Sequence, residues 1–193
     1  MKRKPAYTLG IIMICAGVLA LLSSAGFIVY NVWDENRAAD SAAMATQMLF
    51  EYIEESTENH DPEIVPEFIE IGGELYIGLL SIPALSLELP VNNEWSYPKL
   101  KESPCRYAGS IDDLLVIAAH NYKNHFGSLT KLVSGDTVLL TDAAGGKHQY
   151  LVEEVTTLKA TDIDAMTDSL HDLTLFTCTF GGKARIAVRC VKV

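Results

Sequence analysis

The sequence predicts a mainly β domain, a closed or nearly closed barrel with short helices, preceded by a transmembrane helix and a spacer helix. Three observations lead to this fold class. Residues 8–33 carry no charged side chain, residues 34–59 contain neither glycine nor proline, and short strand-like segments fill the chain from about residue 70. The expected parts are a cytoplasmic tail (1–7), a transmembrane anchor (8–33), an extracellular spacer helix and linker (34–69) and a folded catalytic or binding domain (70–193).

The uncharged segment is longer than the roughly 20 apolar residues that a helix needs to cross a membrane. Basic residues at positions 2–4 precede it, and Asp34 and Glu35 follow it. This asymmetry predicts a single-pass protein of the cell membrane with a cytoplasmic amino terminus and an extracellular domain. A cleavable signal peptide is the alternative, because LLSSAG (21–26) offers small residues for cleavage, although the apolar run continues beyond that site.

The charge of the exported part excludes one class of partner. All 25 acidic residues but only 12 of the 15 basic residues follow residue 33, which gives that part a formal net charge of −13. Such a surface repels nucleic acid and is not attracted to anionic lipid. The sequence also has no CxxC pair and no His/Cys spacing typical of a metal site. We therefore expect no nucleic-acid partner, no metal and no other cofactor.

Residues 34–59 are predicted to form a polar-to-amphipathic helix. Its apolar residues recur at helical spacing; they are Met44, Met48, Leu49 and Tyr52. The following segment contains two prolines and is predicted to be a linker. The helix is expected to act as a spacer that packs on the domain or stands off the membrane.

Seven segments after residue 70 have the pattern of strands. LSLELPV alternates apolar and polar residues, as a half-buried strand does. LLVIAA is a continuous apolar run and predicts a strand buried on both faces. AAGG at 143–146 predicts a hairpin turn between two further strands. The seven segments are 74–82, 85–91, 114–119, 136–141, 148–158, 173–179 and 185–193.

Two of these strands end in side chains that can carry chemistry. Cys178 ends the apolar strand LTLFTC and precedes a Gly-Gly turn. A buried structural role is the alternative, because free cysteine is among the most buried residue types. His120 directly follows LLVIAA, which is a suitable place for an acid–base group. His125 competes with it, but His120 is the histidine joined directly to the buried strand.

The last strand supplies a cation. Arg185 begins RIAVRC seven residues after Cys178, and alternation along the strand puts Arg185 and Arg189 on one face. The other face is apolar and includes Cys190, so Cys190 is interpreted as a buried structural thiol. Arg189 competes with Arg185 but lies about 13 Å further along the strand.

Together these segments resemble the sortases, the membrane-anchored cysteine transpeptidases of Gram-positive cell surfaces. The matching stretches are TLFTC ending at Cys178, RIAV led by Arg185, AAHNYKNHFGSL containing His120, and the early segment LSIPALSLELPV. The resemblance covers roughly residues 74–193. It implies a closed eight-stranded barrel of the sortase type in which Cys178, His120 and Arg185 meet at one rim.

The resemblance also implies an activity. Cys178 would be the nucleophile, His120 the general acid and base, and Arg185 the group that stabilises the thiolate and the oxyanion. The substrates would be secreted proteins with an LPxTG-like C-terminal sorting signal, cleaved between Thr and Gly through a thioacyl-enzyme. The acceptor would be an amine of a lipid II-type cell-wall precursor or of a pilin lysine. The histidine loop looks like that of class B, whereas residues 159–172 have no room for the long helix usual there, so the class stays open.

Other readings of the same residues remain. A non-catalytic, surface-anchored barrel could bind a cell-wall or peptide ligand, with Cys178 as a structural residue. An exported thiol–disulfide protein would use Cys105 and Cys190, although no CxxC supports it. A structural disulfide between Cys105 and Cys190 is a separate hypothesis. With three cysteines in the exported part, at least one thiol is left over unless two chains pair.

Overall fold

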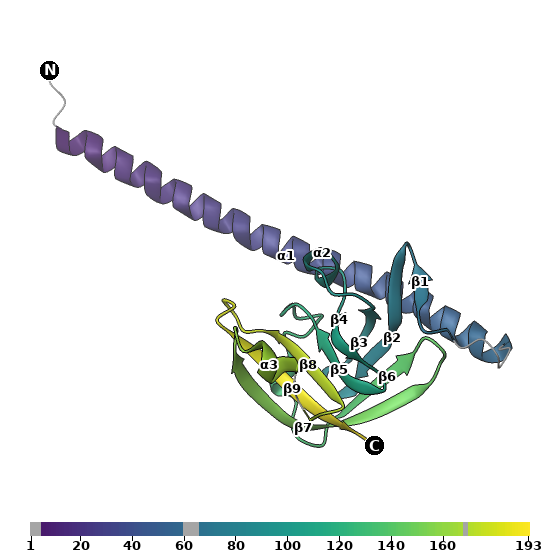
Figure 1. Ribbon diagram of the computed structural model, residues 1–193. Helices are drawn as coiled ribbons and strands as arrows, with labels where there is room; N and C mark the ends of the chain where they lie inside the picture. Colours follow the sequence, from purple (N-terminus) through teal and green to yellow (C-terminus); the bar gives the residue numbers. More distant parts are fainter. Residues whose placement is uncertain (1–4, 60–65, 168–169) are drawn as a thin grey trace. The chain divides into compact units, whose positions relative to one another are not determined.

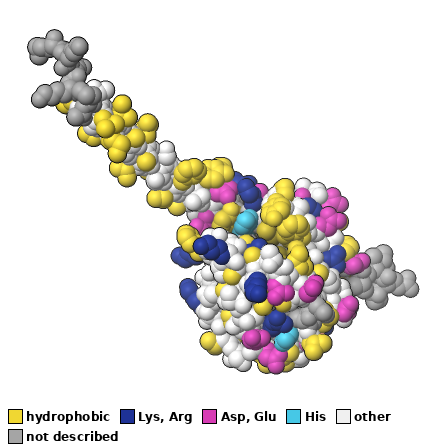
Figure 2. Space-filling view, turned by 60° about the vertical axis from the view of Figure 1, so that its left-hand side comes forward, with side chains coloured by type: hydrophobic (Ala, Val, Ile, Leu, Met, Phe, Trp, Pro, Cys, Tyr) yellow, Lys and Arg dark blue, Asp and Glu magenta, His cyan; other side chains and the backbone are white. Residues whose placement is uncertain are grey.

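The computed structural model describes residues 5–59, 66–167 and 170–193. The chain divides into two compact units, Met1–Arg37 and Ala38–Val193. Helix α1 (Pro5–Asn59) is continuous, so the predicted anchor and spacer form one helix (Figure 1). The stretch Tyr7–Glu55 includes a segment long and apolar enough to cross a membrane, and apolar side chains cover its amino-terminal part (Figure 2). Parts of the predicted tail and linker, residues 1–4 and 60–65, lie outside the described residues.

The carboxy-terminal part of α1, which belongs to the second unit, packs inside that unit through a stripe that the sequence did not predict. Of the four expected apolar positions, Leu49 is buried, whereas Met44, Met48 and Tyr52 are exposed. The buried positions recur every three or four residues and therefore share one face of the helix. They are Ala38, Ala42, Ala45, Leu49 and Ile53. The four apolar residues named from the sequence are large, whereas small alanines form most of the packed face.

Nine strands form a single sheet within the described residues, and eight of them close into a barrel (Figure 1). The ring order is β2-β3-β4-β5-β8-β9-β7-β6, and antiparallel pairing of β2 with β6 closes it. The short β1 pairs with β2 outside the ring. The closed eight-stranded barrel is therefore confirmed. The strands are β1 (Ile69–Ile71), β2 (Glu74–Ile82), β3 (Leu87–Asn92), β4 (Cys105–Ser110), β5 (Asp113–Ala118), β6 (Thr137–Asp142), β7 (Lys147–Lys159), β8 (Leu173–Cys178) and β9 (Ala184–Lys192).

Strand β4 is the ring member that the sequence pattern did not reveal. Its residues, CRYAGS, show neither a long apolar run nor clean alternation. It pairs with β3 through a single parallel bridge, Asn92 to Cys105, and with β5 through a register that shifts twice. Irregular pairing of this kind leaves little periodicity for a sequence pattern to report.

Strand β5 has a core on each side, as its continuous apolar run predicted. Leu115 and Ile117 belong to the barrel interior, whereas Val116 and Ala118 belong to a second cluster on the outer face. Short helices α2 (Tyr97–Leu100) and α3 (Ile163–Thr167) each contribute one residue to this outer cluster. The outer cluster consists of Leu100, Cys105, Val116, Ala118, Met166, Phe176 and Ala187.

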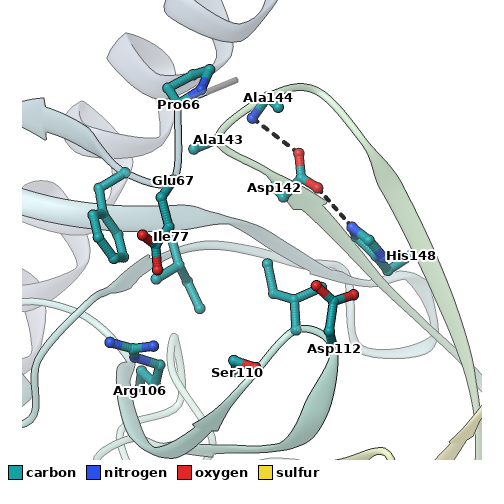
Figure 3. Close-up of a pocket in the computed structure, with 12 residues that line it drawn as sticks. Pro66, Glu67, Ile77, Arg106, Ser110, Asp112, Asp142, Ala143, Ala144 and His148 are labelled. Atoms are coloured by element: carbon teal, nitrogen blue, oxygen red, sulfur yellow. Dashed lines mark hydrogen bonds and ion pairs between the residues drawn. The ribbon is translucent and has the colours of Figure 1, made fainter. Parts of the chain in front are cut away.

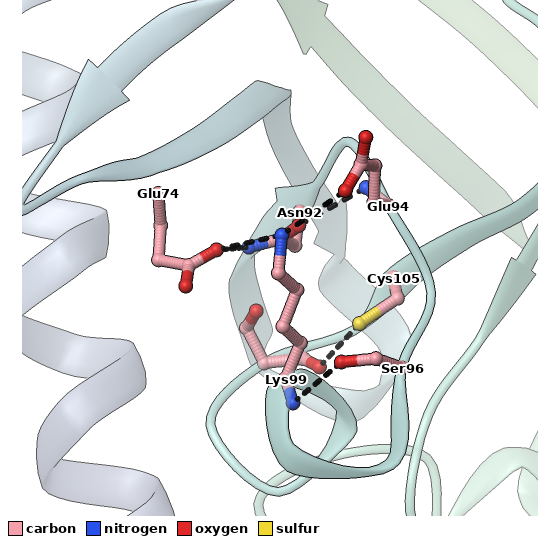
Figure 4. A network of polar contacts seen from close by, with 7 residues as sticks. Glu74, Asn92, Glu94, Ser96, Lys99 and Cys105 are labelled. Atoms are coloured by element: carbon pink, nitrogen blue, oxygen red, sulfur yellow. Dashed lines mark hydrogen bonds and ion pairs between the residues drawn. The ribbon is translucent and has the colours of Figure 1, made fainter.

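A polar network holds the connection between β3 and β4, which contains α2 (Figure 4). The Lys99 ammonium lies 2.9 Å from the Glu74 carboxylate and 3.5 Å from that of Glu94. The Asn92 amide donates to Glu74 at 3.0 Å, and Ser96 Oγ accepts from the Lys99 backbone N–H as the helix N-cap. The hydrogen bonds from Asn92 and Lys99 lower the pKa of Glu74, so the pair is charged at neutral pH. The network thereby fixes α2 against β2 and β3.

Candidate active site

The carboxy-terminal ends of β5 and β8 lie side by side, because these two strands are parallel neighbours. Ala118 pairs with Phe176, and the Ala119 N–H donates to the Phe176 carbonyl at 3.2 Å. His120 and Cys178 each follow two residues after the Ala118–Phe176 pair. Cys178 ends β8 on the outer face that Phe176 also occupies, and His120 follows the end of β5 by two residues, so the register brings both residues to the same end of the sheet.

A buried threonine, which the sequence analysis did not single out, ties the two strand ends together. Thr177 donates its hydroxyl to the Ala119 carbonyl at 2.8 Å, directly before both Cys178 and His120. Its side chain is buried, and an unpaired hydroxyl there would be costly. The signal in the sequence is a polar residue at the inward position of TLFTC. This hydrogen bond holds the backbone before His120 at a fixed distance from the backbone before Cys178.

Arg185 lies directly opposite Cys178 in the antiparallel pair of β8 and β9. Side chains of directly opposed residues have Cβ atoms about 4.5–5.5 Å apart and point to the same face. The Arg185 guanidinium donates from Nη1 to the carbonyls of Gly182 and Ala184, both at 3.1 Å. A guanidinium has five N–H donors, so these bonds orient it without using all of its donors.

The turn between β8 and β9 brings Arg185 back beside Cys178. Gly181 and Gly182 both have left-handed backbone conformations, with φ of +81° and +73°, which glycine adopts without steric cost. Thr179 closes the turn, donating its N–H to Ala184 O at 3.0 Å while its Oγ accepts the Ala184 N–H at 3.0 Å. The turn therefore sets the register that pairs Cys178 with Arg185.

Arg189, four residues further along β9, contacts other groups than Arg185 does. It pairs with Thr174, four residues before Cys178, and its Nη2 donates to the Ala165 carbonyl in α3 at 3.1 Å. Its Nε lies 3.8 Å from the Glu154 carboxylate. Arg189 thus ties α3 to the sheet, and Arg185 is the arginine that lies next to the cysteine.

His125 is buried in the loop that follows His120. Its side chain is 0% exposed, and neither ring nitrogen has a hydrogen-bond partner within the described part of the chain. Burial, and secondarily the charge of His120, lower the pKa of His125 to about 4, with a smaller opposing effect from Glu102. His125 is therefore neutral near pH 7, whereas His120 is only partly buried at the strand end.

The buried state of His125 predicts acid-sensitive stability. Its pKa is depressed from 6.5 to about 4 on folding, so between these values only the unfolded chain takes up a proton and stability falls as pH falls. The loss amounts to roughly 3 kcal/mol between pH 7 and pH 4. Urea unfolding of the full-length protein in detergent should show this loss, and His125→Leu should reduce it by that amount. An identical pH dependence of the two proteins would contradict the buried, neutral imidazole.

The two other cysteines of the second unit differ sharply from Cys178. Cys105 and Cys190 are free, fully buried thiols, and burial raises the pKa of each to about 12. Cys105 lies in the outer cluster and Cys190 in the barrel interior, on opposite faces of the sheet. The hypothesised disulfide between them is therefore absent from the structure. Cys178 is partly exposed at the strand end.

A separate cavity of about 250 Å³ lies near the turns β4–β5 and β6–β7 (Figure 3). The His148 ring pairs with the Asp142 carboxylate at 2.7 Å, and Asp142 also accepts the Ala144 N–H. Ser110, the last residue of β4, and Asp112, which directly precedes β5, line the cavity at the end of β5 opposite His120. The cavity therefore does not include the cysteine, histidine and arginine that the strand register brings together.

Comparisons with known proteins agree with this architecture. The Sortase domain family matches residues 80–193. Sortase A from Corynebacterium diphtheriae is similar in structure with a TM-score of 0.55 and 23% identity, covering 61% of this chain and 60% of that chain. Sortase C1 from Streptococcus suis has a TM-score of 0.54 and 25% identity, covering 61% of this chain and 73% of that one.

A third solved structure aligns over more of the chain. The Clostridium perfringens sortase D5 transpeptidase has a TM-score of 0.57 and 19% identity, covering 82% of this chain and 99% of that chain. No curated protein matches in sequence. The chain spans less than two thirds of the Corynebacterium diphtheriae enzyme, and the structural likenesses below 25% identity concern the fold. The family match itself extends over more than half of the residues and includes all three strand-end side chains, so the chain belongs to the sortase family.

Proposed function

We propose that this sortase is a cysteine transpeptidase with Cys178 as nucleophile, His120 as general acid and base, and Arg185 as the oxyanion-stabilising cation. One observation supports the proposal: Cys178 lies directly opposite Arg185, and His120 follows two residues after the Ala118–Phe176 pair, so the three residues belong to the same end of the sheet. A nearby cation increases the fraction of thiolate at neutral pH, and Arg185 is always charged.

The chemistry divides into two steps. The Cys178 thiolate attacks the Thr carbonyl carbon of an LPxTG-like signal, and Arg185 donates hydrogen bonds to the resulting oxyanion. Protonated His120 gives its proton to the departing Gly amine, the C–N bond breaks, and a thioester remains on Cys178. The neutral His120 then takes a proton from the incoming amine as that amine attacks the thioester. The new amide forms and the thiolate leaves.

The proposed cellular setting follows from α1. The apolar segment 8–33 would anchor the protein in the cell membrane, with residues 1–7 in the cytoplasm and the catalytic domain, 70–193, outside. In that setting the substrates are secreted proteins with a C-terminal sorting signal. The acceptor is an amine of a cell-wall precursor of the lipid II type or a pilin lysine.

Product analysis of the full-length protein in detergent tests the proposal. A library of peptides with LPxTG-like signals is incubated with and without a triglycine or lysine-peptide amine. We expect cleavage between Thr and Gly, a ligated product with a suitable amine, and ping-pong kinetics. Binding of library peptides without any cleavage would overturn the proposal in favour of a non-catalytic peptide-binding barrel.

Two arginine variants test the proposed role of Arg185. Arg185→Ala should lower kcat/KM about 10²- to 10³-fold, because the oxyanion loses its charged donor. Arg189→Ala removes the same charge from the same strand but breaks only contacts with α3 and Glu154, away from Cys178, so it should stay within about tenfold of the wild type. Initial rates on one peptide compare them. A larger loss in Arg189→Ala than in Arg185→Ala would reverse the assignment.

A further inference from the structure

The ring of His120 lies against another aromatic ring of its own loop. The His120 and Tyr122 rings stack with centroids 4.8 Å apart and an angle of 22° between their planes. Tyr122 in turn contacts the His125 ring, with centroids 5.6 Å apart and an angle of 48°. Tyr122 is therefore in contact with both imidazoles, one at the strand end and the other fully buried.

The loop holds Tyr122 in place through its backbone. The Tyr122 carbonyl accepts the N–H groups of His125 and Gly127, at 3.0 and 2.9 Å, and Phe126 N–H donates to the His120 carbonyl at 3.1 Å. A Cβ on Gly127 would lie 2.4 Å from the Asn121 carbonyl oxygen and 2.7 Å from that of Tyr122. Only glycine permits so close an approach. The side chain of Phe126 is fully buried and anchors the loop in the barrel core.

We propose that Tyr122 is a positioning residue that holds the His120 imidazole in the plane required at Cys178; this rests on the proposed function of His120. Rotation of the imidazole about its Cβ–Cγ bond would break the stacked contact, so the contact opposes rotation. The face of the Tyr122 ring also favours a cation, and thus the protonated His120 that donates to the leaving amine. His125, being neutral, adds no opposing charge beside it.

Replacing Tyr122 removes none of the other charged and titratable residues in the part of the protein around His120. Cys178 and Arg185 lie at the adjoining ends of β8 and β9, and Lys123 and His125 belong to the loop itself. Glu102, which precedes the loop in the sequence, acts electrostatically on His125. An effect on His120 titration in a Tyr122 variant therefore reports on the ring contact.

Ring-retaining and ring-free variants of the full-length protein in detergent test the proposal. Tyr122→Leu should lower kcat roughly 3- to 10-fold with KM little changed, because the stack no longer orients the imidazole. It should also shift the His120 titration down by a few tenths of a pH unit. Tyr122→Phe keeps the ring and should retain both properties. Tyr52→Leu, on the exposed face of α1, is the matched control and should leave both unchanged.

The His120 titration is followed by NMR of imidazole-labelled protein, and Tyr122→Met serves as a second ring-free variant in case Tyr122→Leu unfolds. An unchanged kcat and an unchanged His120 titration in a folded ring-free variant would overturn the positioning role. Equal losses in Tyr122→Phe and the ring-free variants would also overturn it, because the hydroxyl would then be responsible. If the wild type cleaves no signal, the proposed function fails, whereas the titration still decides whether the ring acts on His120.

Discussion

Replacing Cys178 with alanine is expected to abolish both cleavage of the sorting signal and transfer to the amine. Without the thiol no thioester forms, so kcat/KM should fall on the order of 10³-fold or more. Cys178 ends β8 on the outer face and is partly exposed, so its removal leaves the packed clusters intact. Initial rates of peptide cleavage and unfolding curves of both proteins measure the effect.

The chain offers two matched controls for Cys178→Ala. Cys105 and Cys190 are buried thiols whose pKa is about 12, so neither supplies a thiolate near neutral pH. Cys105→Ala and Cys190→Ala should each cost on the order of 1 kcal/mol of stability and leave kcat close to the wild type. Full activity of Cys178→Ala, or a loss confined to one of the control variants, would move the nucleophile away from Cys178.

Replacing His120 with alanine is expected to lower kcat about 10²- to 10⁴-fold, the usual contribution of general acid–base catalysis. The amine leaving group needs a proton, whereas a phenolate does not at neutral pH. The variant should therefore lose much less activity toward a phenyl ester that carries the same acyl sequence. Comparing kcat of the wild type and the variant on the amide and on the ester therefore measures how much the proton donated to the leaving group contributes to the rate.

His125 is the control for His120. The buried ring with a pKa of about 4 is neutral and cannot donate a proton near pH 7. His125→Leu should therefore change the acid stability of the protein but retain amide cleavage. Equal losses of His120→Ala on amide and ester substrates, or a greater loss in His125→Leu, would contradict the role proposed for His120.

Local pattern was sufficient to predict most of the barrel. The continuous apolar run LLVIAA predicted a strand buried on both faces. The prediction is confirmed, since each face of β5 packs in its own apolar cluster. CRYAGS was missed because β4 lacks a regular alternation of apolar and polar residues and is irregularly paired. The packed face of α1 was not predicted, because it consists mostly of alanines, whereas the larger Met44 and Met48 are exposed.

The candidate site could be predicted in part for a similar reason. Cys178, His120 and Arg185 each flank a recognisable strand, and strand ends follow from local pattern. Arg185 was preferred to Arg189 from the sequence, but the pairing of Cys178 with Arg185 and of Thr174 with Arg189 becomes visible only in the register of β8 and β9. The state of His125, the Thr177 bond and the Tyr122 stack depend on burial and on contacts between segments. No spacing rule in a single sequence reports such contacts.

The mass of the intact protein during turnover shows whether Cys178 carries the acyl group of the substrate. Full-length protein is mixed with a cleavable signal peptide in the absence of an amine, quenched in acid and analysed by intact and fragment mass spectrometry. We expect a covalent adduct with the mass of the acyl part of the peptide, located on Cys178, absent from Cys178→Ala and released by hydroxylamine. An adduct on any other residue, or cleavage with no hydroxylamine-sensitive adduct, would contradict the assignment of Cys178 as the nucleophile.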